Sequence, residues 1–138
     1  MKVFNGAVRI KSTGGTEEVN ITPDVEAILD ESGVEEGFAL VSTGHTTGAV
    51  HLNNADHDLE GDLQDFLSEL IPNNPTYKHN KGEYGSNADA HIKALVIGSS
   101  VTVPVSKGRL ALGQWQALSF SEFDGPRERL ISVKVMGV

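Results

Sequence analysis

Alternating apolar residues in the C-terminal half of the chain constrain the fold more than any other feature. Apolar side chains occupy every second position in residues 101–105, 110–112 and 131–135. A period of two is that of a β-strand with one buried face. The turn signals Lys107-Gly108 and Asp124-Gly125-Pro126 lie between these segments. The pattern therefore predicts that this half of the chain is mostly antiparallel sheet.

The N-terminal half mixes strand and helix signals. Residues 2–11 and 19–21 alternate likewise around Gly14-Gly15, which predicts a hairpin. Thr22 is a predicted helix N-cap with Pro23 at the first helical position, and Gly33 is the predicted stop. Strands are also expected at residues 38–43 and 49–53. Leucine and phenylalanine recur every three or four residues from 59 to 70, before Pro72, and indicate a second helix. Residues 90–97 favour a third, short helix.

Strands that occur in runs, rather than in strict alternation with helices, indicate an α+β fold. We expect one domain over residues 1–138, with a large, mostly antiparallel, sandwich-like sheet and two or three helices. The chain has no cysteine, which excludes disulfides and thiolate chemistry. Its net charge of -8 argues against a nucleic-acid partner. No apolar run approaches the roughly 20 residues that span a bilayer, so no membrane partner is expected and the predicted location is the cytoplasm.

Three histidines lie in polar segments and are the candidate catalytic residues: His45, His79 and His91. Neutral imidazole is also the commonest metal ligand, so the same three could hold a divalent metal, as a zinc site with one open position. Their spacing matches no ligand motif, and only the fold could bring them together. Three unrelated, hydrogen-bonded histidines are the alternative.

Several other polar residues are candidates for binding a phosphorylated small molecule. Hydroxyl and N–H groups suited to an anion occur at Thr46, Thr47, Ser99 and Ser100, although turn chemistry explains them equally well. Gln114 and Gln116 flank Trp115 at strand spacing, which predicts two amides on one face.

The segment from Glu122 to Arg127 places two carboxylates and an arginine around a turn. Arg127 suits phosphate, and Glu122 with Asp124 suits Mg²⁺. An exposed salt bridge on the turn is the equally simple reading.

Taken in order, these segments resemble the YjbQ-like family. The matching stretches include Gly44-His45-Thr46-Thr47-Gly48, Tyr77-Lys78-His79-Asn80, Asn87-Ala88-Asp89-Ala90-His91, Gly98-Ser99-Ser100, Gly113-Gln114-Trp115-Gln116 and Phe123-Asp124-Gly125-Pro126-Arg127. The match covers nearly the whole chain. The resemblance implies a homotrimer with its site at the three histidines. It also implies a weak thiamine-phosphate synthase activity, in which an aminopyrimidine diphosphate joins a thiazole phosphate and pyrophosphate is released.

This chain departs from the family pattern at three positions. Asn53 stands where an acidic residue is expected, His57 where proline is expected, and Gln114 where threonine is usual. The loss of a carboxylate at Asn53 weakens any metal or base role there.

The leading hypothesis is an enzyme acting on a phosphorylated small molecule. In it, Arg127 and the Ser99-Ser100 loop hold phosphate, one histidine acts as acid–base or metal ligand, and Thr47, Asn87 and Gln116 contact the substrate. A non-catalytic homotrimer that binds a metal or metabolite is the alternative, and a purely structural trimer is the third reading.

Overall fold

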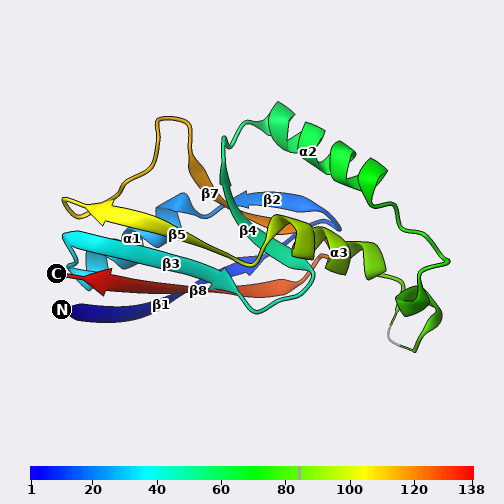
Figure 1. Ribbon diagram of the computed structural model, residues 1–138, viewed down its shortest axis with the longest axis horizontal. Coiled ribbons are helices and arrows are strands. Elements are labelled where there is room, and N and C mark those ends of the chain that lie inside the picture. Colours follow the sequence, from blue (N-terminus) through cyan, green and yellow to red (C-terminus); the bar gives the residue numbers. More distant parts are fainter. Residues whose placement is uncertain (84) are drawn as a thin grey trace.

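The computed structural model describes residues 1–83 and 85–138. Three α-helices and eight strands follow one another along them (Figure 1). Their bounds in chain order are β1 (Lys2–Lys11), β2 (Glu17–Asn20), α1 (Thr22–Ser32), β3 (Glu36–Thr43), β4 (Gly48–Asn53), α2 (His57–Leu70), the 3₁₀ turn η1 (Lys78–Lys81), α3 (Ala88–Ile97), β5 (Ser100–Ser106), β6 (Arg109–Leu110), β7 (Ala117–Glu122) and β8 (Glu128–Gly137). The predicted α+β class with a mostly antiparallel, sandwich-like sheet and two or three helices is confirmed, with three α-helices present in the described residues.

The strands form two antiparallel sheets. The larger has the order β1-β8-β3-β5-β6, and the smaller has the order β2-β7-β4. The main core fills the space between them, with Phe120 and Leu118 from the smaller sheet and Val41, Val133 and Val135 from the larger. Helix α1 adds Val25 and Leu29 to this core.

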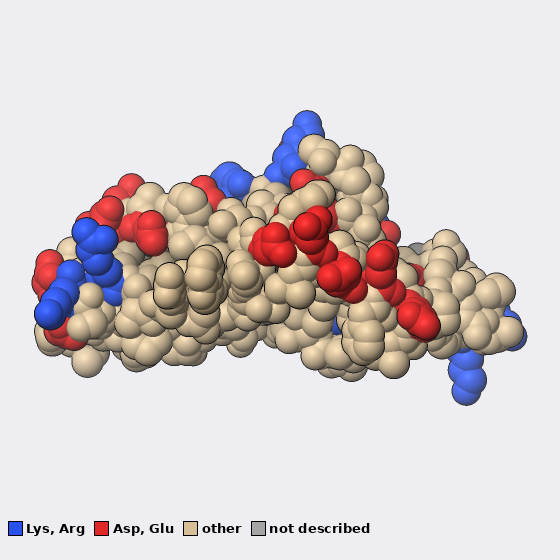
Figure 2. Space-filling model, turned by 90° about the horizontal axis from the view of Figure 1, so that it is seen from above, with Lys and Arg blue, Asp and Glu red and all other residues tan. Residues whose placement is uncertain are grey.

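Helices α2 and α3 lie over the outer face of the smaller sheet (Figure 1). A second, smaller core joins Leu67 of α2, Ala90 and Ala94 of α3, and Ala49 of β4. The apolar stripe of α2 is only partly covered, because Phe66 and Leu70 are exposed. Its other face carries the acidic side chains that form a red band in Figure 2. No helix in the described residues has the length and apolar character needed to cross a membrane.

The helix predictions hold, with one correction. Helix α1 ends at Gly33, whose φ of 68° is the left-handed conformation that favours glycine. However, Thr22 is the first helical residue and not the N-cap, which is Ile21. The Thr22 hydroxyl instead accepts a hydrogen bond from Leu118 N–H at 2.8 Å, so it ties α1 to β7.

The predicted hairpin of residues 2–11 and 19–21 is wrong. Strand β1 pairs with β8 and β2 pairs with β7, so the two lie in different sheets. The chain crosses between the sheets at Ser12, which is buried and extends the β1–β8 pairing through a bond from its N–H to Arg127 O. Gly14-Gly15 therefore marks a change of sheet and not a strand pair.

The predicted strand around Trp115 is also wrong. Gln114 and Trp115 lie in a turn, where Gly113 N–H donates to Gln116 Oε1 at 2.9 Å. Trp115 is 69% exposed and contributes to neither core. Three residues at strand spacing are too few to distinguish a strand from a turn.

Candidate functional site

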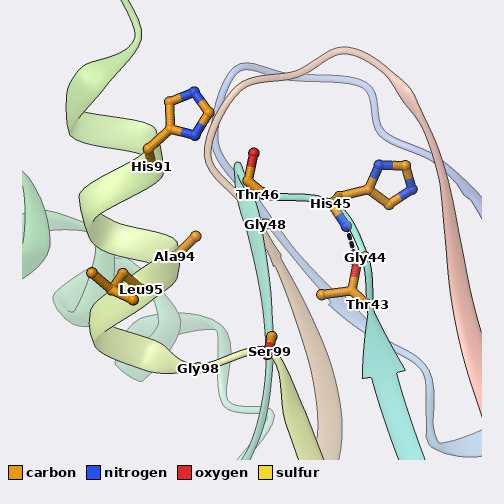
Figure 3. A pocket seen from close by; sticks show the side chains of 10 residues that line it. All are labelled: Thr43, Gly44, His45, Thr46, Gly48, His91, Ala94, Leu95, Gly98 and Ser99. Atoms are coloured by element: carbon orange, nitrogen blue, oxygen red, sulfur yellow. Dashed lines mark hydrogen bonds between the residues drawn. The ribbon is translucent and has the colours of Figure 1, made fainter. Parts of the chain in front are cut away.

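A cavity of about 440 Å³ lies between α3 and the loop that joins β3 to β4 (Figure 3). Both ends of the 44–48 loop are fixed, because β3 and β4 each pair with a neighbouring strand. Its lining residues are Thr43, Gly44, His45, Thr46, Gly48, His91, Ala94, Leu95, Gly98 and Ser99. The loop thus faces both the helix and the Gly98-Ser99 connection.

Close backbone contacts hold the floor of this cavity. Thr43 N–H donates to Ser99 O at 2.9 Å, and Val50 N–H donates to Gly98 O at 3.1 Å. Gly48 is required here, because a Cβ at this position would overlap Cζ of the buried Phe120 ring. Gly48 therefore has a packing reason, whereas a Cβ at Gly44 would meet no atom within 4 Å.

His45 has one ring nitrogen committed to the backbone. Its Nε2 accepts a hydrogen bond from Leu130 N–H at 3.0 Å. Leu130 lies one residue before the end of the β8–β3 pairing, so the imidazole extends that ladder. Burial and the nearby Arg129 charge lower the pKa of His45, against a smaller opposing effect of Glu122. His45 is therefore neutral near pH 7, with its proton on Nδ1.

His79 and His91 lie together on the other side of the cavity. Their ring centroids are 5.0 Å apart in an edge-to-face arrangement. His91 lines the main cavity and also a neighbouring hollow of about 430 Å³ that His79 lines. His91 thus connects the two spaces, whereas the His45 ring points away from α3 (Figure 3).

A chain of hydrogen bonds leads from His79 to Arg127. His79 Nε2 contacts Asn87 Oδ1 at 2.8 Å, and Asn87 Nδ2 donates to Asp124 Oδ2 at 2.8 Å. Arg127 Nη2 donates to the same carboxylate oxygen at 2.9 Å, and its Nε donates to Asp124 O at 2.8 Å. Four of the residues singled out in the sequence are therefore directly linked.

The three histidines of one chain do not fit a shared metal site. Among the described residues, no three histidine, aspartate or glutamate side chains gather closely enough to hold a metal ion. His45 also has its Nε2 lone pair directed at Leu130 N–H. The two carboxylates expected for Mg²⁺ have different partners in the structure: Glu122 accepts from Arg129, and Asp124 accepts from Arg127 and Asn87.

Sequence reasoning missed a buried ion pair beneath the loop. Arg129 and Glu122 are both buried and form a two-point ion pair. Ser12 Oγ donates to Glu122 Oε1 at 2.6 Å, and Arg129 Nη2 donates to Thr47 Oγ1 at 2.8 Å. A signal was present, because Arg129 has the same strand phase as the inward-facing Ile131 and Val133.

Burial and the contacts of Glu122 shift the pKa of its carboxyl in opposite directions. Burial is the largest influence and raises the pKa of its carboxyl. Hydrogen bonds from Arg129, Ser12 and the Asp124 N–H, together with the Arg129 charge, outweigh burial and leave the pKa below its ordinary value. Glu122 is therefore ionised, and the pair fixes the 44–48 loop through Thr47.

Only some of the remaining candidate residues line the cavity. Thr46 and Ser99 line the cavity, whereas Thr47 is buried against Arg129. Ser100 begins β5 and is not among the cavity residues. Gln116 directly precedes β7. The first residue of β7, Ala117, pairs with Asn53 at the end of β4, whereas the cavity residue Gly48 is at the start of β4. Gln116 therefore lies at the opposite end of β7 from the cavity.

Comparison with known proteins identifies relatives over the whole of this fold. The family model described as UPF0047 protein YjbQ-like matches residues 6–138. A UPF0047 protein of Methanocaldococcus jannaschii is 42% identical over 130 residues, 94% of this chain and 91% of that protein. The UPF0047 protein YugU of Bacillus subtilis is 41% identical over 132 residues, 94% of this chain and 97% of that protein.

Solved structures agree with these sequence matches. The crystal structure of a YbjQ-like protein of unknown function from Sulfolobus solfataricus superposes with a TM-score of 0.95 at 33% identity, and the match covers 99% of both chains. An uncharacterised conserved protein from Clostridium acetobutylicum gives a TM-score of 0.88 at 39% identity, covering 94% of this chain and 98% of that one. The chain therefore belongs to the YjbQ-like UPF0047 family.

Proposed function

We propose that this chain is an enzyme that binds a phosphorylated small molecule in the cavity between α3 and the 44–48 loop. The observation that supports the proposal most is the make-up of the cavity wall. Glycine backbone, the Thr46 and Ser99 hydroxyls and the His91 ring line this space, and His45 lines both it and an adjoining hollow with Arg9 and Lys11. Such donors suit phosphate oxygens, and a volume of about 440 Å³ is the size of a small-molecule pocket.

The two histidines that line the cavity supply complementary hydrogen-bonding groups. His45 retains an N–H at Nδ1, because its Nε2 accepts from the backbone. That N–H is a donor for an anionic oxygen. His91 lines both the cavity and the adjoining hollow, so its ring contacts a ligand that extends from one to the other.

The reaction we propose is a thiamine-phosphate synthase-like transfer. The thiazole nitrogen supplies the electron pair for a new C–N bond to the aminopyrimidine methylene. The electron pair of the broken C–O bond leaves with pyrophosphate. Such a step needs charge stabilised on the leaving group more than it needs a protein nucleophile, and donors that are already in place provide that.

Binding of pyrophosphate and of thiazole phosphate tests this proposal. Calorimetry on the wild type should show saturable binding of both, and His91→Ala should weaken it at least tenfold. The matched control is His57→Ala, because His57 is exposed at the start of α2 and is not among the cavity residues. Equal affinity in the wild type and both variants would contradict the proposed site.

We also propose that the chain assembles as a homotrimer. Large apolar side chains are exposed at Phe66 on α2, at Leu95 and Val96 on α3, and at Trp115. Among the described strands, β1 is an edge of ten residues in the larger sheet. Exposed edges and apolar surface of this kind are covered by assembly in many proteins. Light scattering that gives a monomer mass at micromolar concentration would refute the trimer.

A further inference from the structure

We propose that Arg127, Asp124 and Asn87 act as positioning residues that hold His79 with its proton on Nε2, so that Nδ1 accepts a hydrogen bond from the ligand. This inference rests on the proposed function and assigns a role within the same site. Arg127 was expected to contact phosphate, and the hydrogen bonds of the described residues indicate a different use for it.

The argument begins with the carboxylate. An ionised Asp124 side chain can only accept hydrogen bonds. Its Oδ2 accepts from Arg127 Nη2 at 2.9 Å and from the Asn87 side chain at 2.8 Å. The second contact on Arg127, from Nε to Asp124 O at 2.8 Å, holds the guanidinium across the turn. Asp124 is therefore fixed as an acceptor that faces Asn87.

The orientation of the Asn87 amide follows. The oxygen and nitrogen of an asparagine amide are distinguished by their partners. Because Asp124 can only accept, the Asn87 atom that faces it must be Nδ2. The atom that faces His79 is then Oδ1, 2.8 Å from Nε2. An amide oxygen can only accept, so His79 Nε2 must carry a proton and donate it.

The consequence concerns the other ring nitrogen. In the neutral imidazole one nitrogen donates and the other accepts. With Nε2 committed as the donor, Nδ1 is the one position of His79 that can take up a proton. His45 is held in the opposite state, because its Nε2 accepts from Leu130 N–H and its proton stays on Nδ1. The site thus offers a donor at His45 and an acceptor at His79.

This pairing specifies the class of ligand. A suitable molecule carries an anionic oxygen for the His45 side and an N–H or O–H group for His79 Nδ1. An aminopyrimidine phosphate has both. The main cavity adjoins the His79 hollow through His91 and a second hollow through His45, so a molecule that meets both His45 and His79 must extend across the cavity.

Nitrogen NMR of the imidazole rings measures this directly. Full-length protein is labelled with ¹⁵N-histidine, and the His79 signals are assigned by their loss in His79→Gln. In the neutral ring, we expect a protonated-type signal from Nε2 and an unprotonated-type signal from Nδ1. In Asn87→Ala and Asp124→Ala this single state should become a mixture of both tautomers. The control Asn54→Ala, at an exposed position beyond β4, should leave it unchanged.

A conservative variant separates positioning from simple loss of packing. In Asp124→Asn the amide oxygen can take the place of Oδ2 and accept from both Arg127 Nη2 and Asn87 Nδ2. The wild-type tautomer should therefore be kept in Asp124→Asn and lost in Asp124→Ala. A single Nδ1–H tautomer in the wild type, or no change in Asn87→Ala, would overturn the inference. Calorimetry with pyrophosphate on the same samples reports on the proposed function independently, because the tautomer is measured in the free protein.

Discussion

Removing the charge of Glu122 tests the buried ion pair that supports the 44–48 loop. Glu122 accepts from Ser12 Oγ at 2.6 Å, from Arg129 Nε at 2.8 Å and from Asp124 N–H at 3.1 Å. Arg129 is itself 5% exposed, so Glu122→Gln leaves a guanidinium buried without its counter-ion. Loss of one partner from a buried pair costs about 3–5 kcal/mol.

This cost converts into a large thermal shift. A chain of this length loses about 3 °C of melting temperature for each kcal/mol of unfolding free energy. Glu122→Gln should therefore melt about 10–15 °C below the wild type. Urea unfolding followed by far-UV circular dichroism is the direct assay. The double variant Glu122→Leu with Arg129→Met should recover part of the loss, because it removes both charges together.

The exposed ion pair of Arg127 and Asp124 provides the control. The Arg127 side chain is 54% exposed, and an exposed pair contributes well under about 1 kcal/mol. Arg127→Ala should therefore change stability little. If Glu122→Gln also lost less than about 1 kcal/mol, the buried charge pair would not have the structural role argued for it.

Two further predictions concern pH and packing. The folded-state pKa values of His45 and Glu122 are both lowered, so the unfolded chain binds more protons below about pH 6.5 and again below about pH 4.5, and stability falls in both ranges. The free energy of unfolding, measured from about pH 7.5 to about pH 4, should lose its decrease near pH 6.5 in His45→Gln. If that decrease persists in the variant, another group causes it. Gly48→Ala should strongly destabilise the protein, because the new Cβ would overlap the Phe120 ring. A Cβ at Gly61 in α2 would meet no neighbouring atom within 4 Å, so Gly61→Ala should stabilise the protein by up to about 1 kcal/mol. Equal melting temperatures of the two variants would contradict the packing argument.

Local patterns were sufficient to predict most elements of the fold. The three-and-four spacing from Leu59 to Leu70 indicated α2, and the alternation of Ile131, Val133 and Val135 indicated β8. Each element has one apolar face, which is buried in β8 and partly covered in α2, and that face leaves a period in the sequence. The pairing of one strand with another produces no periodic pattern in the sequence. The Gly14-Gly15 turn signals a reversal, but only the buried Ser12 with its bond to Glu122, 110 residues away, shows that the chain changes sheet.

The sequence indicates which residues belong to the site better than it indicates the role of each. His79, Asn87 and Arg127 were all singled out from the sequence, and hydrogen bonds through Asp124 link them. Their roles depend on which atom faces which partner, and that is set by tertiary contacts. The acceptor role of His45 Nε2, for example, depends on the backbone of a residue 85 positions later. Thr47 looked like a ligand contact because its partner, Arg129, could not be inferred from local pattern.

We expect a phosphate group to bind in the cavity between α3 and the 44–48 loop. A crystal structure of the protein with pyrophosphate tests it most directly. We predict density for the anion in contact with Thr46 and Ser99, within hydrogen-bonding reach of His45 Nδ1 or the His91 ring. Pyrophosphate bound only in the adjoining hollow lined by Arg9, Lys11 and His45, with the main cavity holding water alone, would contradict the account.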